Sequence, residues 1–386
     1  MKITNLRVTG FRSLKDVDWH PGDLNIVIGR NASGKSNLLD LFEMLSCLPR
    51  RGLGDYVQSR GGLSSLLWDG QAEHIDIVLD FELSPDVKEG NGAALQYSLQ
   101  LLPSGLLGSY QKSKESLVRQ GDGRDLLKEA RDLGHSKPTK ALEEFRRSTY
   151  ESSLAHLDHL SGVSECDSLA LWLAAWHVYQ VIDTSRRAKV REAPVARYEN
   201  QIENDGSNLI SVLHTLYSEN RAFAERIDAA MGAAFNHFVS LVFPPSPAAD
   251  QRVQMKVRWR NLNRDCPAWD LSDGTLRFLY LMAILASPNP PSLIAIDEPE
   301  TGLHPRMMGI VAECAMDAAT RTQVVLMTHS PEFLDAFRDT QPTVTVADLV
   351  DGATQLRTPS AEDLAYWLEE YTLGDIYRTG QLESMG

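Results

Sequence analysis

The sequence predicts an α/β fold with parallel strands, and the prediction rests on three apolar runs. Residues 24–29, 292–297 and 323–328 each have the pattern of a buried strand, and each is followed by a polar turn and a helix-like pattern. Alternation of strands and helices is typical of a parallel sheet with helices packed on it. The chain has 386 residues, enough for two domains or for one large domain with an insertion.

The remaining segments suggest how the chain is organised. Residues 2–11 and 74–83 alternate as strands do. Between residues 84 and 204 the chain becomes more charged, is mainly helical in pattern and has no sustained heptads. We therefore predict one head in two halves, residues 1–83 and 205–386, separated by a mainly helical insertion over 84–204.

Composition and charge exclude several classes of protein. No apolar run approaches the roughly 18 residues of a membrane span, and the best candidate, residues 169–181, predicts a buried helix. The N-terminus lacks the apolar region of a signal peptide. Four well separated cysteines without a CxxC pair predict no metal knuckle and no disulfide framework, so we expect a cytoplasmic protein. The net charge of −14 means that nucleic acid would require a local basic patch.

Residues 29–36, GRNASGKS, carry the most specific motif of the chain, because they match G-x-x-x-x-G-K-[ST] in full between a buried strand and a helical pattern over 36–48. Backbone amides of such a loop wrap a nucleotide phosphate, the lysine neutralises phosphate oxygens, and the serine hydroxyl binds Mg²⁺. The residues predicted to bind nucleotide here are Gly29, Arg30, Asn31, Ala32, Ser33, Gly34, Lys35 and Ser36. The alternative, a chance glycine-rich turn, does not explain the flanking strand and helix.

Two later strands end in groups suited to ATP hydrolysis. Asp297 and Glu298 follow the run LIAI, at the carboxyl edge of the sheet where ligands usually bind. Asp297 fits a Mg²⁺ ligand, and Glu298 fits a base that orients an attacking water. His329 ends the next strand, where it would meet the terminal phosphate of ATP. A structural histidine and a solvated acidic strand end are the alternatives.

The stretch LSDGTLRFLYL, residues 271–281, has a helical pattern with an unusual first turn. Ser272 fits an N-cap, since its hydroxyl can accept a hydrogen bond from a backbone amide of the first turn. Gly274 costs about 1 kcal/mol in a helix relative to alanine. We therefore expect that something approaches the backbone closely at Gly274.

The order of these four elements resembles the ABC-type ATPases, in the branch that includes RecF, SMC and OLD-type proteins. The resemblance covers residues 1–83 and 205–386, with LSDGT in the place of the signature Leu-Ser-Gly-Gly-Gln. It implies a mixed, partly parallel core with antiparallel N-terminal strands. It also implies a head-to-head dimer that holds two ATP molecules, in which the signature residues of one subunit face the phosphate bound by the other. Those residues are Ser272, Asp273, Gly274 and Thr275.

The resemblance assigns further residues. Arg12 and Ser13 of GFRS and Asn37 of GRNASGKSN would lie near the nucleotide, Gln71 is the nearest candidate for a metal-binding Q-loop glutamine, and residues 300–304 would form the D-loop. Because a carboxylate would repel phosphate, we predict that Asp273 turns away from it, near the helix dipole or a basic group. After His329 only 57 residues remain (386 − 329), too few for the TOPRIM nuclease domain of OLD proteins.

Basic residues gather in two places that are candidates for nucleic-acid binding. One set lies on or beside the basic face of an alternating strand pattern over 251–260: Arg252, Lys256, Arg258, Arg260 and Arg264. The other closes the insertion: Arg186, Arg187, Lys189 and Arg191. A solvated strand face is the alternative. His156 and His159 we interpret as a surface pair, and Trp172, Trp176 and Tyr179 as packing residues.

These features predict a Mg²⁺-dependent ATPase that dimerises around ATP and switches a DNA-, RNA- or partner-binding surface. The resemblance favours bacterial DNA repair or anti-phage defence, with a separate effector protein such as a nuclease and no membrane partner. The alternative is a nucleotide sensor or scaffold with little or no turnover. An ABC transporter subunit is disfavoured by the large insertion and by the form DEPETGLHP.

Overall fold

The structure is a computed structural model, and the chain in it forms two compact units. The residues described are 1–83, 94–105, 109–134, 150–155, 164–244, 251–337, 342–360, 364, 368 and 371–384. The first unit comprises Met1–His177, Thr343–Ser360 and Glu383–Gly386, and the second comprises Val178–Pro342 and Ala361–Leu382.

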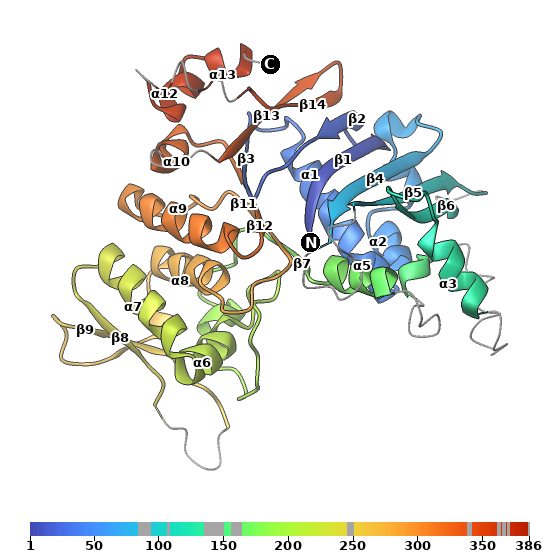
Figure 1. Cartoon of the computed structure of the whole chain (residues 1–386). Helices are drawn as coiled ribbons and strands as arrows, with labels where there is room; N and C mark the ends of the chain where they lie inside the picture. Colours follow the sequence, from blue (N-terminus) through green and yellow to red (C-terminus); the bar gives the residue numbers. More distant parts are fainter. Residues whose placement is uncertain are drawn as a thin grey trace. The chain divides into compact units, whose positions relative to one another are not determined.

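A five-stranded antiparallel sheet with the order β2-β1-β4-β5-β6 dominates the first unit (Figure 1). Its strands are β1 (Lys2–Phe11), β2 (Leu14–Trp19), β4 (Ile75–Glu82), β5 (Ala94–Pro103) and β6 (Tyr110–Arg119). In β4 every second residue, from Ile75 to Phe81, is buried, because successive side chains of a strand point to opposite faces. The predicted strands over 2–11 and 74–83 are confirmed.

The first unit also contains the strand that precedes the P-loop. All five residues of β3 (Leu24–Ile28) are buried. β3 pairs in parallel with β13 (Thr343–Val350), and β13 pairs antiparallel with β14 (Ala353–Arg357). Helix α1 (Lys35–Cys47) follows the loop directly. The predicted strand–loop–helix is therefore confirmed, whereas the β13–β14 hairpin was not anticipated from the sequence.

The segment over 84–204 differs from the mainly helical insertion that the sequence predicts. Its described part holds β5 and β6, which extend the sheet beyond β4, besides α3 (Leu126–Gly134), α5 (Ser164–Ala174) and β7 (Trp176–Tyr179). In β6, buried and exposed residues alternate less regularly than in β4. The strand is therefore harder to recognise from its sequence. His156 and His159 lie outside the described residues.

The apolar run over 169–181 forms two elements instead of one helix, because α5 ends at Ala174 and the chain continues as β7. Packing is the role of its tryptophans, as the sequence predicts. The Trp172 and Trp176 rings meet edge to face with centroids 4.9 Å apart, and Trp172 also lies against Phe81 at 5.2 Å. Such pairs add to the stability that burial itself provides.

The second unit is built on a parallel strand pair with helices packed beside it. β11 (Leu293–Asp297) and β12 (Gln323–Thr328) pair in register from Leu293 opposite Gln323 to Asp297 opposite Met327. The helices are α6 (Leu209–Glu219), α7 (Arg221–Ala234), α8 (Asp273–Leu285) and α9 (Pro305–Ala319), and α8 packs against the other three. The confirmed fold class is therefore α/β with parallel core strands and an antiparallel N-terminal sheet.

Helices α6 and α7 come from one continuous helical pattern in the sequence. The chain breaks at Asn220, whose side chain accepts a hydrogen bond from the Phe223 amide and so caps α7. Asparagine is a strong N-cap residue because its side-chain oxygen replaces a missing backbone acceptor. The break allows α6 and α7 to pack against each other.

A small antiparallel sheet, β10-β9-β8, completes the second unit. Its strands are β8 (Phe238–Val242), β9 (Lys256–Trp259) and β10 (Cys266–Pro267). The strand predicted over 251–260 is therefore shorter, since Arg252 makes only an isolated bridge to Val195. The remaining short helices are α2 (Leu53–Ser59), α10 (Pro331–Leu334), α12 (Leu373–Arg378) and α13 (Gln381–Ser384).

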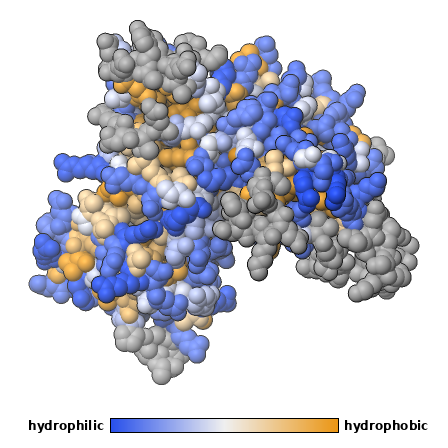
Figure 2. All heavy atoms as spheres, viewed as in Figure 1, coloured by the Kyte–Doolittle hydropathy of each residue, from blue (hydrophilic) through white to orange (hydrophobic). Residues whose placement is uncertain are grey.

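The surface is mainly hydrophilic and also exposes several large apolar side chains. On the face shown in Figure 2, hydrophilic residues surround scattered apolar ones. Trp269, whose exposed fraction is 57%, and Leu262, at 48%, are among the exposed large apolar residues. Among the helices in the described ranges, none is long and apolar enough to cross a membrane.

Candidate functional site

The P-loop backbone requires small residues. Gly34 has φ +96°, a left-handed conformation that costs other residues free energy. A Cβ at Gly34 would lie 1.8 Å from the Thr354 hydroxyl oxygen, and one at Gly29 would lie 2.2 Å from the Ala347 carbonyl oxygen. The hairpin β13–β14 therefore lies directly behind the loop, and only glycine fits at these two positions.

Lys35 closes over the loop that precedes it. Its side chain is buried, and its ammonium group donates hydrogen bonds to the carbonyls of Gly29 (2.5 Å) and Arg30 (2.9 Å). These carbonyls hold the amine across the loop, where a P-loop lysine meets the β- and γ-phosphates. In a nucleotide complex, phosphate oxygens would accept the hydrogen bonds of the Lys35 ammonium group instead of these two carbonyls.

A chain of hydrogen bonds ties the P-loop to two distant segments. The Asn37 amide donates to the Ser13 hydroxyl (2.6 Å), which bonds to the Thr354 hydroxyl (2.6 Å). Thr354 in turn donates to the Ser33 carbonyl (3.0 Å), so Ser13 must be the donor to Thr354. The structure thus brings Ser13 and Asn37 to the loop, as the resemblance implies. Thr354 is a fourth member that no sequence motif marks.

Arg12 lies beside the same network. Its φ is +50°, and its guanidinium lies 2.8 Å from an oxygen of Asp40 and 3.4 Å from the side-chain oxygen of Asn37. Asp40 also pairs with Arg60 at 2.9 Å. Asp40 therefore holds Arg12 along α1. Gln71 is exposed at the end of the short 3₁₀ turn Trp68–Gly70, and none of the described contacts joins it to the P-loop.

Glu298 adopts an unusual backbone conformation at the carboxyl end of β11. Its φ is +45°, and its amide donates to the Met327 carbonyl (2.8 Å). A non-glycine residue in this region costs about 1–3 kcal/mol. The side chain accepts a hydrogen bond from Thr301 (3.2 Å) and lies 3.1 Å from Nδ1 of His329. Sequence placed Glu298 and His329 on neighbouring strands, and the structure brings their side chains together.

His329 follows β12 and is exposed. With Nδ1 next to the Glu298 carboxylate, the neutral imidazole carries its proton on Nδ1 and keeps Nε2 as an acceptor. A protonated His329 would present an N–H at Nε2 instead. The neutral form can accept a hydrogen bond from a water at Nε2, and the protonated form can donate one to a phosphate oxygen.

Glu300 is a second carboxyl group near His329, besides that of Glu298, and it is buried. Thr328 donates to its Oε1 (2.5 Å), and Nδ1 of His329 lies 3.9 Å from the same oxygen. Burial raises the pKa of Glu300, although the Thr328 hydrogen bond and His329 oppose the rise. The sequence assigned Glu300 only to the D-loop segment, so its place beside His329 is an addition from the structure.

The helix α8 begins as predicted. Ser272 is its N-cap and accepts a hydrogen bond from the Thr275 amide (3.2 Å). A Cβ at Gly274 would lie 3.1 Å from the Gly302 carbonyl oxygen, closer than almost all real Cβ contacts. The backbone that approaches Gly274 in the second unit is thus the residue 302 turn, which follows Glu298 and Glu300.

Asp273 pairs with a basic group, as the sequence predicts. Its partner is Arg191, at 2.5 Å. Arg191 is buried and donates further hydrogen bonds to backbone carbonyls of Thr184 (2.8 Å) and Leu271 (2.7 Å), with longer ones to residues 268 and 269. Arg191 therefore holds the segment 268–275, which we name the signature loop. The sequence placed Arg191 in an exposed basic cluster, and this was wrong because its charge is used inside the unit.

Three arginines on or beside the basic strand face, Arg252, Arg258 and Arg264, make hydrogen bonds to neighbouring groups. Arg258 makes two hydrogen bonds to Asp265, of 2.9 and 3.0 Å, and Arg264 makes one to Asp270 at 3.2 Å. Arg252 donates to the Ala193 carbonyl (3.0 Å). Because carboxylates neutralise two of these arginines, the face offers less positive charge than the sequence indicates.

The chain offers donors that fit Mg²⁺, which prefers oxygen ligands and usually takes only one or two protein groups besides phosphate and water. These are the Ser36 hydroxyl in the first turn of α1 and the Asp297 carboxylate at the end of β11. In the described ranges, no group of three or more His, Cys, Asp and Glu side chains could hold a metal ion. The Ser36 hydroxyl of the first unit and the Asp297 carboxylate of the second are each an oxygen donor of the kind that Mg²⁺ takes.

Comparisons with known proteins identify a family and a fold for the chain. A family model described as "AAA domain, putative AbiEii toxin, Type IV TA system" matches residues 24–335, which include the P-loop, the signature loop and the two strand ends. No curated protein matches the chain.

Several solved structures share the fold. The SmcHead bound to the C-winged helix domain of ScpA matches with a TM-score of 0.59 and 14% identity, covering 94% of this chain and 100% of that one. A Smc head domain derived from Pyrococcus furiosus, with an extended coiled coil and bound to the C-terminal domain of ScpA, has a TM-score of 0.53 and 17% identity and covers 95% and 98%. A Smc head domain with a coiled coil and joint, from Pyrococcus yayanosii, has a TM-score of 0.52 and 14% identity and covers 95% and 99%.

Proposed function

Since this chain belongs to the AAA-domain family that the comparison identifies and has the fold of an ABC/SMC-like P-loop ATPase head, we propose that it hydrolyses ATP with Mg²⁺. The observation that carries the proposal is the pair Glu298–His329 at the carboxyl ends of two parallel strands. A carboxylate and an imidazole held 3.1 Å apart can orient a water and contact the phosphate that it attacks.

Each motif has a role in this proposal. The amides of the P-loop and Lys35 bind the phosphates, and Ser36 and Asp297 supply oxygen ligands to Mg²⁺, which neutralises phosphate charge when bound. Glu298 orients the water, and the strain at its φ of +45° fixes the direction of its carboxylate. His329, in its protonated form, donates a hydrogen bond to the terminal phosphate through Nε2.

The signature loop has no phosphate partner within its own unit in this proposal. Ser272 and the amides of the first turn of α8 form a helix N-terminus, which binds anions. We assign them to the phosphate held by a second copy of the chain, so that ATP closes a head-to-head homodimer and hydrolysis opens it. Asp273 does not repel that phosphate, because Arg191 neutralises it.

The biological role that these properties support best is a nucleotide-driven switch for a separate effector protein, such as a nuclease, in anti-phage defence or DNA repair. The family description, which names a toxin of a Type IV toxin–antitoxin system, supports a defence role. Two of the similar Smc heads are bound to domains of the protein ScpA, and we propose that this head likewise binds a separate protein.

Replacing Glu298 tests the enzymatic proposal. We expect Glu298→Gln to lower kcat by about 10²–10⁴, the range for loss of a general base, while ATP binding persists and an ATP-bound dimer accumulates in size-exclusion chromatography. Lys35→Ala should lose ATP binding and the dimer together. Glu225→Gln, which changes an exposed carboxylate paired only with Arg221, is the matched control and should leave kcat unchanged.

Equal ATPase rates in wild type and Glu298→Gln would contradict the proposal. If wild type also held unhydrolysed ATP, the chain would be a nucleotide sensor or scaffold, the alternative function that the same motifs allow.

A further inference from the structure

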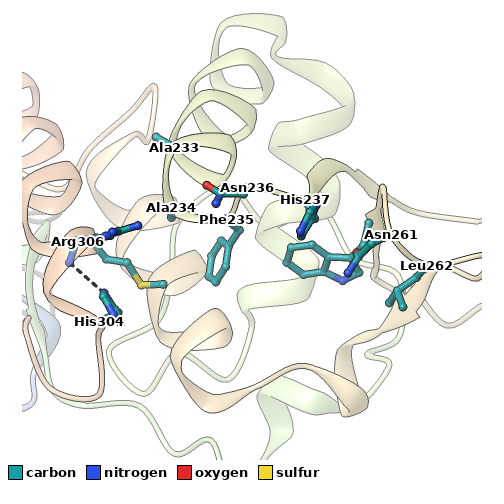
Figure 3. Close-up of a pocket in the computed structure, with 11 residues that line it drawn as sticks. Ala233, Ala234, Phe235, Asn236, His237, Asn261, Leu262, His304 and Arg306 are labelled. Atoms are coloured by element: carbon teal, nitrogen blue, oxygen red, sulfur yellow. Dashed lines mark hydrogen bonds between the residues drawn. The ribbon is translucent and has the colours of Figure 1, made fainter.

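A cavity of ≈ 490 Å³ opens in the second unit (Figure 3). It lies between the end of α7, the turn that follows β9 and the start of α9. The lining residues are Ala233, Ala234, Phe235, Asn236, His237, Trp259, Asn261, Leu262, His304, Arg306 and Met307. Its volume is within the range of small-molecule sites, about 300–1,000 Å³.

Aromatic rings form part of the cavity wall and are held in place from behind. Phe235 meets Trp259 edge to face with centroids 5.7 Å apart, and Phe235 also meets the buried Phe278 of α8 at 5.9 Å. Trp259 has a second edge contact with Phe238 at 6.1 Å. These contacts fix the two rings, so the protein loses little further side-chain entropy when a flat ligand packs on them.

Two of the polar lining groups, Arg306 and His304, can donate hydrogen bonds to an anion. Nδ1 of His304 accepts a hydrogen bond from the Arg306 amide (3.2 Å), so the neutral imidazole carries its proton on Nε2 and donates there. Figure 3 shows His304 and Arg306 at one end of the cavity, Asn261 and Leu262 at the other, and Phe235 between them. No Asp or Glu is among the lining residues, although acidic residues outnumber basic ones by 52 to 38 in the whole chain.

A wall of aromatic rings next to Arg and His donors, without acidic groups, is complementary to a flat ring that carries a phosphate. We propose that this cavity binds one nucleotide unit, with the base against Phe235 and Trp259 and the phosphate on Arg306 and His304. The unit comes from single-stranded nucleic acid or from a free mononucleotide, since both carry the same base and phosphate. Aromatic side chains stack on bases without sequence preference, and arginine binds phosphate with two parallel hydrogen bonds.

This site differs from the basic strand face that the sequence indicates. On that face Arg258 and Arg264 are neutralised by Asp265 and Asp270, whereas Trp259 belongs to the cavity. The inference does not depend on ATP hydrolysis, because none of the lining residues belongs to the P-loop or to the pair Glu298–His329.

The test measures the anisotropy of a fluorescein-labelled oligothymidylate of about ten nucleotides, within the site size of single-strand binders. It uses the full chain with Lys35→Ala, so that nucleotide cannot be held by the P-loop. Arg306→Glu and Asn261→Asp each place a negative charge at the exposed rim and should weaken binding at least about tenfold. Arg264→Glu, on the strand face, is the matched control and should change the affinity less than about twofold.

The two sources of the nucleotide are separated by competition with thymidine monophosphate. Displacement of the oligonucleotide at millimolar monophosphate identifies a mononucleotide site, and binding of the oligonucleotide without such competition identifies a single-strand site. The proposal is overturned if neither probe binds at millimolar concentration. It is also overturned if Arg306→Glu and Asn261→Asp bind as tightly as the parent. ATP-dependent dimerisation of the chain with an intact Lys35 is measured separately, so failure here leaves the proposed ATPase standing.

Discussion

The P-loop and the signature loop are both supported by a residue distant in the sequence, but the two supports work differently. Behind the P-loop lies Thr354, a neutral hydroxyl that bonds to Ser33, 321 positions away. Behind the signature loop lies Arg191, a buried cation that bonds to Asp273, 82 positions away. The conformation of the P-loop therefore depends mainly on the space between the loop and Thr354. The conformation of the signature loop depends mainly on the positive charge of Arg191, which Asp273 and backbone carbonyls compensate.

This difference predicts which substitutions each loop tolerates. Extra volume should damage the P-loop, since a Cβ at Gly34 has no room. Loss of a cation should damage the signature loop, since several backbone carbonyls and one carboxylate share a single guanidinium. Substitutions that reverse these sensitivities would show that the comparison is wrong.

Arg191→Met should have the largest effect, because it keeps the apolar stem and removes all of the donors. A hydrogen bond from a charged donor typically contributes about 1.5–3 kcal/mol, and Arg191 donates to several buried carbonyls at once. We expect a loss of this order in the free energy of unfolding and loss of ATP-dependent dimerisation. Binding of ATP to the P-loop should persist, as measured by equilibrium binding of a fluorescent ATP analogue.

Two companion variants separate charge from packing at Arg191. Arg191→Lys keeps the charge but cannot reach several carbonyls at once, so it should restore only part of the stability. Asp273→Asn removes the carboxylate, whose side chain is 63% exposed, and should cost less than about 1 kcal/mol. A loss in Asp273→Asn as large as that in Arg191→Met would contradict a role for Arg191 that includes the backbone carbonyls.

Gly34→Ala should have the next largest effect. The left-handed backbone costs alanine about 1–2 kcal/mol, and the clash with Thr354 adds about 1–3 kcal/mol of overpacking. We expect loss of ATP binding together with lower thermal stability. Gly123→Ala is the matched control, because Gly123 also has a positive φ, +69°, but has nothing within 4 Å of an added Cβ.

The comparison of Gly123→Ala with Gly34→Ala separates backbone strain from the clash with Thr354. If Gly123→Ala lowered stability as much as Gly34→Ala, backbone strain alone would explain the loss and Thr354 would not support the loop. A double variant, Gly34→Ala with Thr354→Ala, should regain part of the stability, since it removes the atom that the new Cβ meets.

The sequence predicted the parts of the site that are encoded in short contiguous motifs. The loop 29–36, the N-cap Ser272 and the strand-end positions of Asp297 and His329 follow from local rules of glycine conformation, helix capping and apolar runs. The confirmed strand over 2–11 follows from alternation in the same way.

Contacts that join distant segments were not predictable in this way. Thr354 lies on a hairpin that shows no motif, and Arg191 looked like one of several exposed basic residues. Only the folded chain reveals that Arg191 is buried beside Asp273. The strand β5 was missed although it alternates as regularly as β4, whereas β6 alternates less regularly.

Glu300 should give the smallest effect, and a pH-dependent one. Burial raises its pKa above the ordinary value of 4.5, so the folded state favours the protonated carboxyl. Its contribution to stability is therefore fully present below that value and is lost as pH rises through the folded-state pKa. Glu300→Gln stays neutral and can still accept the Thr328 hydrogen bond, so it should melt at a higher temperature than wild type at about pH 8, and the difference should shrink towards about pH 5. Thermal unfolding of both proteins across this range measures the effect, with Glu225→Gln as the exposed control. A difference that stays constant with pH would mean that Glu300 is already ionised in the folded chain over the whole range, stabilised there by His329.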